Sequence, residues 1–441
     1  MKLPEGAAFC LERLERAGFS AYVVGGCVRD WVLGLQPHDY DICTSAKPPE
    51  ICQVFSDFPL IHSGEKHGTI GVIFQNEVYE ITTFRTEGDY RDSRHPGWVK
   101  FVPQVEADLA RRDFTINAMA WNPKTGLTDP FGGQKDLQNR VLSTVGDPET
   151  RFREDALRIL RGVRFALRYG LTPRSETLQA MISLAPTLHA LARERVYAEL
   201  CQILLLAKGE DLGTFCPILT QAVPELAPMV GFLQHNPHHA YDVYTHTAHV
   251  VEQMPQDLTL RWAALLHDTG KPQTFTLDEA GHGHFYGHPE ASRRIAHQVL
   301  TTLKAPTALR EGVEMLVGNH MLLLTPDKKL LRKRIGKYGP ELVEKLLTLQ
   351  EGDFSAKGTG LPTPEDFSLT RKALEELLQE PPAFTLRDLA IGGKDLLALG
   401  YPSGPILGKT LNALLEQVQQ EQLPNERQAL LEAAEKARKT K

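Results

Sequence analysis

The sequence predicts an α/β head with a small mixed sheet, followed by an all-helical neck, a helical body and a helical tail. Two observations lead to this fold class. Short strand and helix patterns alternate over the first ~140 residues, whereas apolar residues recur at the helical period from residue 147 onward. At 441 residues the chain also exceeds one ordinary hydrophobic core. We therefore expect a head over 1–145, a neck over 146–225, a body over 226–360 and a tail over 361–441.

The head begins with a strand that runs into a glycine turn, AYVVGG at 21–26, and VRDWVLG at 28–34 has the pattern of the next helix. Two further strands are predicted from TIGVIF at 69–74 and VYEITTF at 78–84. The polar stretch between Arg85 and Phe101 contains Gly, Asp and Pro and is predicted as a long loop. Three helices are predicted in the neck, at 154–170, 175–191 and 193–209.

Composition and charge limit the class of protein. The chain is 42% hydrophobic and 24% charged, and no apolar run reaches the ~20 residues that cross a bilayer, so we expect a cytoplasmic protein without membrane attachment. Six cysteines without a CxxC pair argue against a zinc site or a disulfide framework. The net charge of −6 argues weakly against a nucleic-acid partner, but basic clusters at 151–174 and 328–337 leave room for a phosphate backbone. Either cluster could instead be a solvated helix face.

The strongest motif joins GGCVRD at 25–30 to HDYD at 38–41. Gly25 and Gly26 let the backbone approach a triphosphate closely, because no Cβ stands in the way. Arg29, near the start of the following helix, can meet phosphate oxygens with its fork of donors. Asp39 and Asp41 are two residues apart, so on a strand both carboxylates face the same side, as nucleotidyl transfer with two Mg²⁺ ions requires.

In this order and spacing the motif resembles that of the DNA polymerase β-like nucleotidyltransferases, in particular the bacterial class II tRNA nucleotidyltransferase and poly(A) polymerase group. The resemblance is close over the first ~210 residues, where RRDFTINAMAWNP at 111–123 resembles the second family signature. It implies that Arg112 contacts phosphate, Asp113 the ribose 2′-hydroxyl, and that Asn117 shapes the nucleotide site. Glu80 is either a third metal-binding carboxylate or an exposed strand glutamate, and the sequence leaves both open.

EDALR at 154–158 is the candidate for reading the nucleobase. Asp155 and Arg158 have the i, i+3 spacing of one helix face, and a carboxylate beside a guanidinium can imitate the edge of a templating base. The alternative is an ordinary salt bridge within the helix. The resemblance favours base reading, since EDxxR matches the family motif that reads C and A, with Glu154 orienting the arginine. Further along this helix, Arg161 and Arg164 are predicted to join the nucleotide site.

Two other segments extend the resemblance. RERV at 193–196 is similar to a family motif whose arginine supports the base-reading helix. The polar segment GDYRDSRHP at 88–96 matches the position of a flexible family loop that permits the switch from CTP to ATP, which favours addition of a complete CCA end. The alternative for this segment is a plain surface loop.

The predicted body carries histidines in an order that resembles the HD metal-dependent phosphohydrolases. Imidazoles and carboxylates of this kind hold one or two divalent metals. Lys271, in HDTGKP, could contact phosphate, and a purely structural body without hydrolytic activity remains the alternative. Four residues form the first predicted metal position and two complete a second, for a divalent ion such as Mn, Ni, Co or Mg: His246, His267, Asp268 and Asp353, then His288 and His320.

The resemblance as a whole implies an enzyme that adds CCA to the 3′ end of tRNA without a template. The expected mechanism is in-line attack by the tRNA 3′-hydroxyl on the α-phosphate of CTP or ATP, with Mg²⁺ at the aspartate pair. An A-adding enzyme and a poly(A) polymerase share the head motifs. From a different class, the chain could be an HD phosphohydrolase whose head is a nucleotide-binding regulatory module. The sequence indicates no obligate protein partner.

Overall fold

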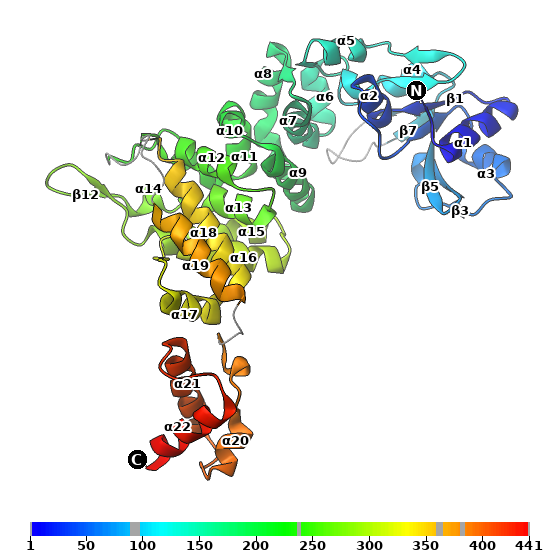
Figure 1. The fold of residues 1–441 in the computed structure, drawn as a ribbon. Coiled ribbons are helices and arrows are strands. Elements are labelled where there is room, and N and C mark those ends of the chain that lie inside the picture. The colour runs from blue at the N-terminus through cyan, green and yellow to red at the C-terminus, as the bar shows by residue number, and fades with distance from the viewer. Residues whose placement is uncertain (1, 89–97, 236–239, 359–364, 380–383, 440–441) are drawn as a thin grey trace. The chain divides into compact units, whose positions relative to one another are not determined.

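The computed structural model describes residues 2–88, 98–235, 240–358, 365–379 and 384–439. The chain forms two compact units. The N-terminal unit comprises the residues up to 206 together with 214–224, and the C-terminal unit comprises 207–213 and 225–441 (Figure 1). The finer division into head, neck, body and tail stays a prediction.

A seven-stranded sheet forms the centre of the head, in the order β3-β4-β5-β2-β1-β8-β9 (Figure 1). Strands β2 and β5 pair in parallel and the other neighbours are antiparallel, so the predicted small mixed sheet is confirmed. The strand bounds are β1 Ala21–Val24, β2 Ile42–Thr44, β3 Leu60–Ile61, β4 Thr69–Phe74, β5 Glu77–Thr83, β8 Ala120–Asn122 and β9 Gly126–Thr128.

Short helices accompany this sheet and its core. They are α1 Glu5–Arg16, α2 Gly26–Val32, α3 Pro48–Val54, α4 Val105–Leu109 and α5 Gly133–Gln138. Helix α4 buries Leu109 in one cluster with Val24 of β1, Ala120 of β8 and Phe84. Because β1 belongs to this core and lies between β2 and β8, the glycine turn that follows it is held at the end of an interior strand.

The segment between Arg85 and Phe101, predicted as one long loop, begins and ends with a strand. Its two ends pair as an antiparallel hairpin, β6 (Arg85–Gly88) and β7 (Trp98–Phe101). The ladder pairs Glu87 with Val99, and Glu87 also bonds Arg85 and Arg111, which stabilises the base of the hairpin. Loop composition misled the prediction here because polar residues can also form an edge hairpin. Residues 89–97, and with them nearly all of GDYRDSRHP, lie outside the described residues.

The neck is helical, with one break that the sequence pattern does not reveal. Helix α6 ends at Glu154, and α7 begins at Leu157. Between them Asp155 is extended (φ −145°, ψ 104°), and its carboxylate accepts the Leu157 N–H. The prediction of one helix from 154 to 170 is therefore wrong. The neck and its junctions contain α6 Pro148–Glu154, α7 Leu157–Tyr169, α8 Ser175–Leu184, α9 Arg193–Leu206, α10 Gly209–Thr214 and α11 Cys216–Ala222, with short strands β10 Val141–Leu142 and β11 Thr172–Pro173.

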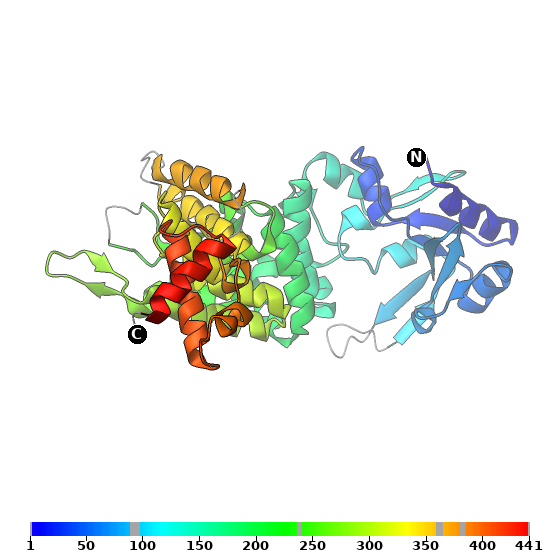
Figure 2. The ribbon, with the colours of Figure 1, turned by 60° about the horizontal axis from the view of Figure 1, so that its bottom comes forward.

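The C-terminal unit is a set of packed helices with one small hairpin, coloured from green to red in Figure 2. Helix α13 packs against α12, α16 and α18, and α15 packs along α16. Its elements are α12 Val243–Gln253, α13 Leu258–Leu266, α14 Lys271–Thr274, β12 Thr276–Leu277, β13 Gly283–His284, α15 His288–Thr302, α16 Thr307–Asn319, α17 Lys328–Tyr338, α18 Pro340–Ser355, α19 Glu365–Gln379, α20 Gly393–Ala398, α21 Pro405–Gln419 and α22 Arg427–Lys439.

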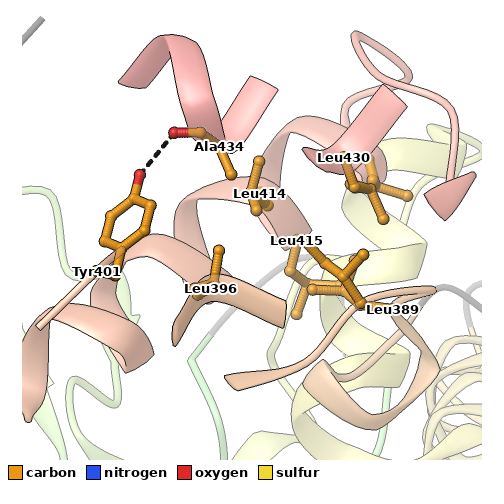
Figure 3. Packing of buried hydrophobic residues seen from close by; sticks show 9 residues of the cluster. Leu389, Leu396, Tyr401, Leu414, Leu415, Leu430 and Ala434 are labelled. Carbon is orange, nitrogen blue, oxygen red and sulfur yellow. Dashed lines mark hydrogen bonds between the residues drawn. The ribbon is translucent and has the colours of Figure 1, made fainter. Parts of the chain in front are cut away.

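The last three helices, α20 to α22, enclose a hydrophobic cluster of their own (Figure 3). Leu396, Leu414 and Leu430 form its centre, one from each helix. The Tyr401 hydroxyl donates to the carbonyl of Ala434 at 2.7 Å, so the polar end of this buried ring is satisfied. Within the described ranges, no helix combines the length and the apolar character that crossing a bilayer demands.

Candidate active site and metal centre

Three carboxylates meet in one cleft of the head, with a volume of about 960 Å³. Asp39 and Asp41 lie in the segment that leads into β2, and Glu80 lies on β5. The parallel pairing aligns Ile42 with Ile81, so the residues just before them, Asp41 and Glu80, lie side by side at the same level of the sheet. The structure thus brings the aspartate pair together with the glutamate whose role the sequence left open.

The charges in this cleft disfavour one another. Although Asp41 is exposed as a residue, its carboxyl group loses solvent in the cleft, and this raises its pKa above the ordinary value. Glu80 and Asp39 raise the pKa of Asp41 further through like charge, while Arg112 opposes them. Carboxylates gathered in this way, with hard oxygen donors, are the ligand set that Mg²⁺ binds.

The glycine turn lies next to Arg112. Gly25 has φ +77°, a conformation that favours glycine, and its N–H donates to the carbonyl of Met119. A Cβ at Gly25 would approach Nη1 of Arg112 to 2.8 Å, so the missing side chain leaves room for this guanidinium. Gly26, by contrast, begins α2 and would tolerate a Cβ at ordinary contact distance. Arg112 lies near both the turn and Asp41 of the cleft. Its ion pair with Asp108 helps to hold it there.

Arg29 lies on α2 and is almost enclosed, with 7% of its surface exposed. Its Nε donates to Asp30 at 2.9 Å and its Nη1 donates to Asn117 at 2.5 Å. The rings of Tyr169 and Phe165 on α7 cover it, at 4.4 and 5.4 Å from the guanidinium carbon to each ring centroid. The predicted phosphate contact would therefore use an arginine whose orientation is already set by its neighbours.

Asn117 links Arg29 to Asp113 through hydrogen bonds. Its amide donates to Asp113 Oδ1 at 3.1 Å, and the same oxygen accepts the Phe114 N–H. Arg161 on α7 binds the other oxygen at 2.7 Å. Although burial opposes the charge, Arg161 and Asn117 hold the pKa of Asp113 down to about 2. Asp113, predicted to meet a ribose hydroxyl, here connects the 111–117 segment to α7.

The i, i+3 spacing suggested that Asp155 and Arg158 share one helix face. They do not, because the helix breaks at Asp155. Arg195, in the RERV segment, donates to Asp155 Oδ2 at 2.9 Å, so the predicted support by a later arginine is confirmed as a contact. Arg158 pairs with Glu154, the contact through which Glu154 was predicted to orient it. Arg158 also donates to the carbonyl of Arg111 at 3.3 Å, next to Arg112.

Sequence reasoning missed some of the residues that organise this site. Tyr169 and Asp30 hold Arg29, and the Tyr169 hydroxyl donates to Asp30 at 3.1 Å. The i, i+4 spacing of Phe165 and Tyr169 on α7 was the available signal, but it is also the pattern of an ordinary apolar helix face. Arg164 is paired with Glu199 of α9 at 2.7 Å, and its contact with nucleotide stays a prediction.

In the C-terminal unit, the six predicted metal ligands converge from five helices or helix ends. Asp268 lies at their centre and belongs to two groups whose donor atoms are within 4.8 Å of one another. One group adds His246 and His267, with Asp353 at 2.9 Å from His246 Nε2; the other adds His288 and His320. An opening of about 280 Å³ reaches Asp268, His288, His320 and Asp353.

The four histidine rings are oriented alike. Each Nδ1 faces a backbone carbonyl, and since a carbonyl can only accept, each Nδ1 carries the proton. The Nε2 atoms of all four rings therefore point inward, with those of His288 and His320 only 3.0 Å apart and that of His246 2.9 Å from Asp353 Oδ1. Burial lowers the pKa of His320 to about 4, so this ring stays neutral. Two facing lone pairs repel unless a cation lies near them, and such backbone-oriented imidazoles are characteristic of metal ligands.

Lys271, predicted to contact phosphate, is enclosed in the same cluster. Its ammonium lies 2.7 Å from Asp268 Oδ2 and donates to Gln234 Oε1 at 2.8 Å. It is 6% exposed. The lysine thus neutralises part of the Asp268 charge and fixes this carboxylate in place.

Comparison with known proteins agrees with this architecture. Residues 21–143 match the family described as poly A polymerase head domain, and 290–434 match tRNA nucleotidyltransferase domain 2. The CCA-adding enzyme of Staphylococcus epidermidis is 34% identical over 97% of this chain and 96% of that protein. The CCA-adding enzyme of Limosilactobacillus fermentum is 35% identical over 98% and 96%.

Among solved structures, the Bacillus stearothermophilus CCA-adding enzyme in complex with CTP superposes with a TM-score of 0.71 at 28% identity, covering 100% of this chain and 99% of that one. The Thermotoga maritima CCA-adding enzyme complexed with tRNA shares the fold, with a TM-score of 0.62 at 20% identity over 98% and 94%. Fold and head site together define a nucleotidyltransferase. With relatives above 30% identity along nearly its whole length, the chain belongs to the family of CCA-adding enzymes.

Proposed function

We propose that this protein adds C, C and A to the 3′ end of tRNA without a nucleic-acid template, using CTP and ATP. Its full-length likeness to CCA-adding enzymes supports the reaction. The observation that carries the assignment is the joint placement of Asp39, Asp41 and Glu80 in one cleft beside the Gly25 turn and Arg112. As an enzyme of tRNA processing, it would work in the cytoplasm.

Mg²⁺ is the cofactor that fits the head. Asp39 and Asp41 would hold it, with Glu80 as the third carboxylate, and their mutual repulsion is the electrostatic reason that a cation belongs there. When bound, Mg²⁺ supplies charge stabilisation for nucleophile, triphosphate and leaving group in an in-line displacement.

The protein's own groups would position the nucleotide. The Gly25 turn and Arg112 would hold the triphosphate, since a backbone without Cβ and a guanidinium lie together there. Arg29 would add a phosphate contact from its enclosed position under Tyr169. Asp155 and Arg158 would read the base edge. The helix break separates them, but Arg195 fixes Asp155 and Glu154 fixes Arg158.

The test uses tRNA transcripts that lack CCA, end in C or end in CC, each with labelled CTP or ATP. Two cytidines followed by one adenosine on the bare transcript are expected. Incorporation of ATP alone on the CC-ended transcript would indicate an A-adding enzyme, and long A tails on arbitrary RNA a poly(A) polymerase. No incorporation on any RNA would overturn the assignment.

We further propose a divalent metal centre in the C-terminal unit with phosphohydrolase activity as a second function. The inward Nε2 atoms around Asp268 support it, because such a set is costly to bury without a cation. A bound Mn, Ni, Co or Mg ion would supply an activated water for hydrolysis. Release of phosphate from phosphomonoesters by the wild type, lost in His267→Ala while nucleotide addition persists, is expected. Equal hydrolysis by both proteins would contradict this function.

A further inference from the structure

Thr115 joins the segment that organises the nucleotide site to a second buried carboxylate. It begins the short turn η2 (Thr115–Asn117), whose last residue bonds both Arg29 and Asp113. The Thr115 hydroxyl donates to Asp136 Oδ2 at 2.7 Å, and both residues are only 5% exposed. Asp136 therefore holds the turn that carries Asn117.

Helix α5, which carries Asp136, approaches this turn very closely. A Cβ at Gly133 would lie 2.2 Å from the carbonyl oxygen of Thr115, so the contact requires glycine. Asp129 accepts the N–H groups of Gly133 and Gln134 at 2.8 and 2.9 Å, which fixes the start of α5. A backbone contact and a side-chain hydrogen bond together set the distance between α5 and the turn.

Arg174, just before α8, supplies the counter-ion of Asp136. Its Nη2 donates to Asp136 Oδ1 at 3.0 Å. Strands β10 and β11 bring these residues together, because they pair in parallel and the Arg174 N–H donates to the carbonyl of Leu142 at the end of β10. The carboxylate thus has one oxygen on the turn and one on Arg174, whose side chain is half exposed.

A buried carboxylate is a costly way to hold a threonine. Removing a charge from water is unfavourable unless its oxygens are paired, and here each oxygen of Asp136 has one partner. An apolar contact would avoid this cost, but it would not fix the turn in the same way, because hydrogen bonds are directional. The carboxylate therefore contributes a defined position for the turn.

We propose that Thr115, Asp136 and Arg174 form a positioning relay for the triphosphate site. Arg174 holds the carboxylate of Asp136, and Asp136 holds Thr115. The turn that Thr115 begins then presents Asn117 to Arg29. All three act through Asn117, so they are positioning residues. The relay rests on the proposed nucleotidyl transfer, in which Arg29 contacts phosphate.

The test measures KM and kcat for CTP and ATP on a tRNA lacking CCA, together with the Tm of each protein. Thr115→Val removes the hydroxyl at nearly constant shape. It should raise both nucleotide KM values by about 5- to 20-fold and leave kcat and the KM for tRNA unchanged, because a misplaced Arg29 weakens nucleotide binding. Thr115→Ser restores the hydroxyl and should restore KM.

Thr83→Val is the matched control. Thr83 is also buried in the head, and its hydroxyl donates to the carbonyl of Ala46 at 2.8 Å, outside the relay. This variant should lower the Tm, because it leaves a buried acceptor without its donor, and should keep the wild-type nucleotide KM.

A double-mutant cycle tests the part of Arg174. Arg174→Gln changes a half-exposed side chain, so this variant keeps the fold. Asp136→Asn retains an acceptor for Thr115 and loses the ion pair. Each change should raise the nucleotide KM by about 2- to 5-fold. The double variant should show no more than the larger single effect, because both changes break the same pair.

A wild-type KM in Thr115→Val, a fall in kcat in its place, or an equal rise of KM in Thr83→Val overturns the relay. If Thr115→Val does not fold, the cycle decides, and additive effects of the Asp136 and Arg174 changes overturn the proposal. Calorimetric titration of CTP without tRNA gives the second readout. If wild type adds no nucleotide, the proposed function fails, while the CTP affinities still decide the relay. A wild type that binds no CTP overturns both.

Discussion

Arg29 of α2 lies beneath the ring of Tyr169 at the end of α7, with 4.4 Å between the guanidinium carbon and the ring centroid. The Tyr169 hydroxyl donates to Asp30, the same carboxylate that accepts Arg29 Nε. The helix that carries Arg158 and the helix that follows the glycine turn are therefore joined through one aromatic residue. Tyr169 is a positioning residue for Arg29.

Tyr169→Leu should raise the KM for both CTP and ATP by ~5- to 30-fold with little change in kcat, because a cation–π contact is worth ~1–2 kcal/mol in an enclosed site. Tyr169→Phe keeps the ring and should rescue most of this loss. Steady-state kinetics on a tRNA lacking CCA measures both. A fall in kcat at constant KM would contradict the positioning role.

Asp41→Ala should lower incorporation of CTP and ATP alike by more than about 100-fold, because it removes a ligand for Mg²⁺. Glu80→Gln should show a smaller loss that excess Mg²⁺ partly restores. Glu77→Gln is the matched control, since Glu77 lines the same cleft but is engaged by the Tyr79 hydroxyl. A Glu80 variant as active as the Glu77 variant would rule out the third-carboxylate role.

Arg195→Ala should reduce the preference for CTP over ATP on tRNA lacking CCA by about tenfold, since it frees the Asp155 carboxylate and one base contact is worth ~1–3 kcal/mol. Arg193→Ala on the same helix provides the control, because Arg193 bonds the backbone of His189. Competition between the two nucleotides at equal concentration measures the preference. An unchanged ratio in the Arg195 variant would separate Arg195 from base choice.

Acid should destabilise the head through Asp113. Its pKa is about 2 in the folded protein, against ~3.9 in an unfolded chain, so the charged group stabilises the fold above pH ~4. This contribution, about 2 kcal/mol, disappears as the pH falls from ~4 towards ~2. Urea unfolding at several pH values should show a shallower acid dependence in Asp113→Asn than in wild type. Parallel pH curves for the two proteins would argue against this linkage.

Metal analysis of the purified protein should find a divalent ion in wild type and markedly less in His267→Ala. A chelator should lower the Tm of wild type and leave that of the variant unchanged, because only wild type has a metal to lose. His282→Ala is the control, since His282 is an exposed residue beside Asp278. Equal metal content in all three proteins would place the ion elsewhere.

Local pattern predicted much of the head correctly. The strand over 21–24, the glycine turn and the helix that follows are contiguous, and their propensities act within a few residues of one another. The break at Asp155 was not visible in the same way. Apolar spacing continues from Ala156 through α7, while the carboxylate of Asp155 takes a capping position that its residue type permits but does not require.

The sequence by itself determined which chemical groups are present and in what order: the glycine pair, Arg29, the aspartate pair and the ordered histidines. Tertiary structure decided which of them meet. Glu80 joined Asp41 through the parallel register of β2 and β5, and the histidine Nε2 atoms converged through the packing of separate helices. The physical reason is that local periodicity specifies only which face of an element is apolar, whereas contacts between distant segments depend on register and packing.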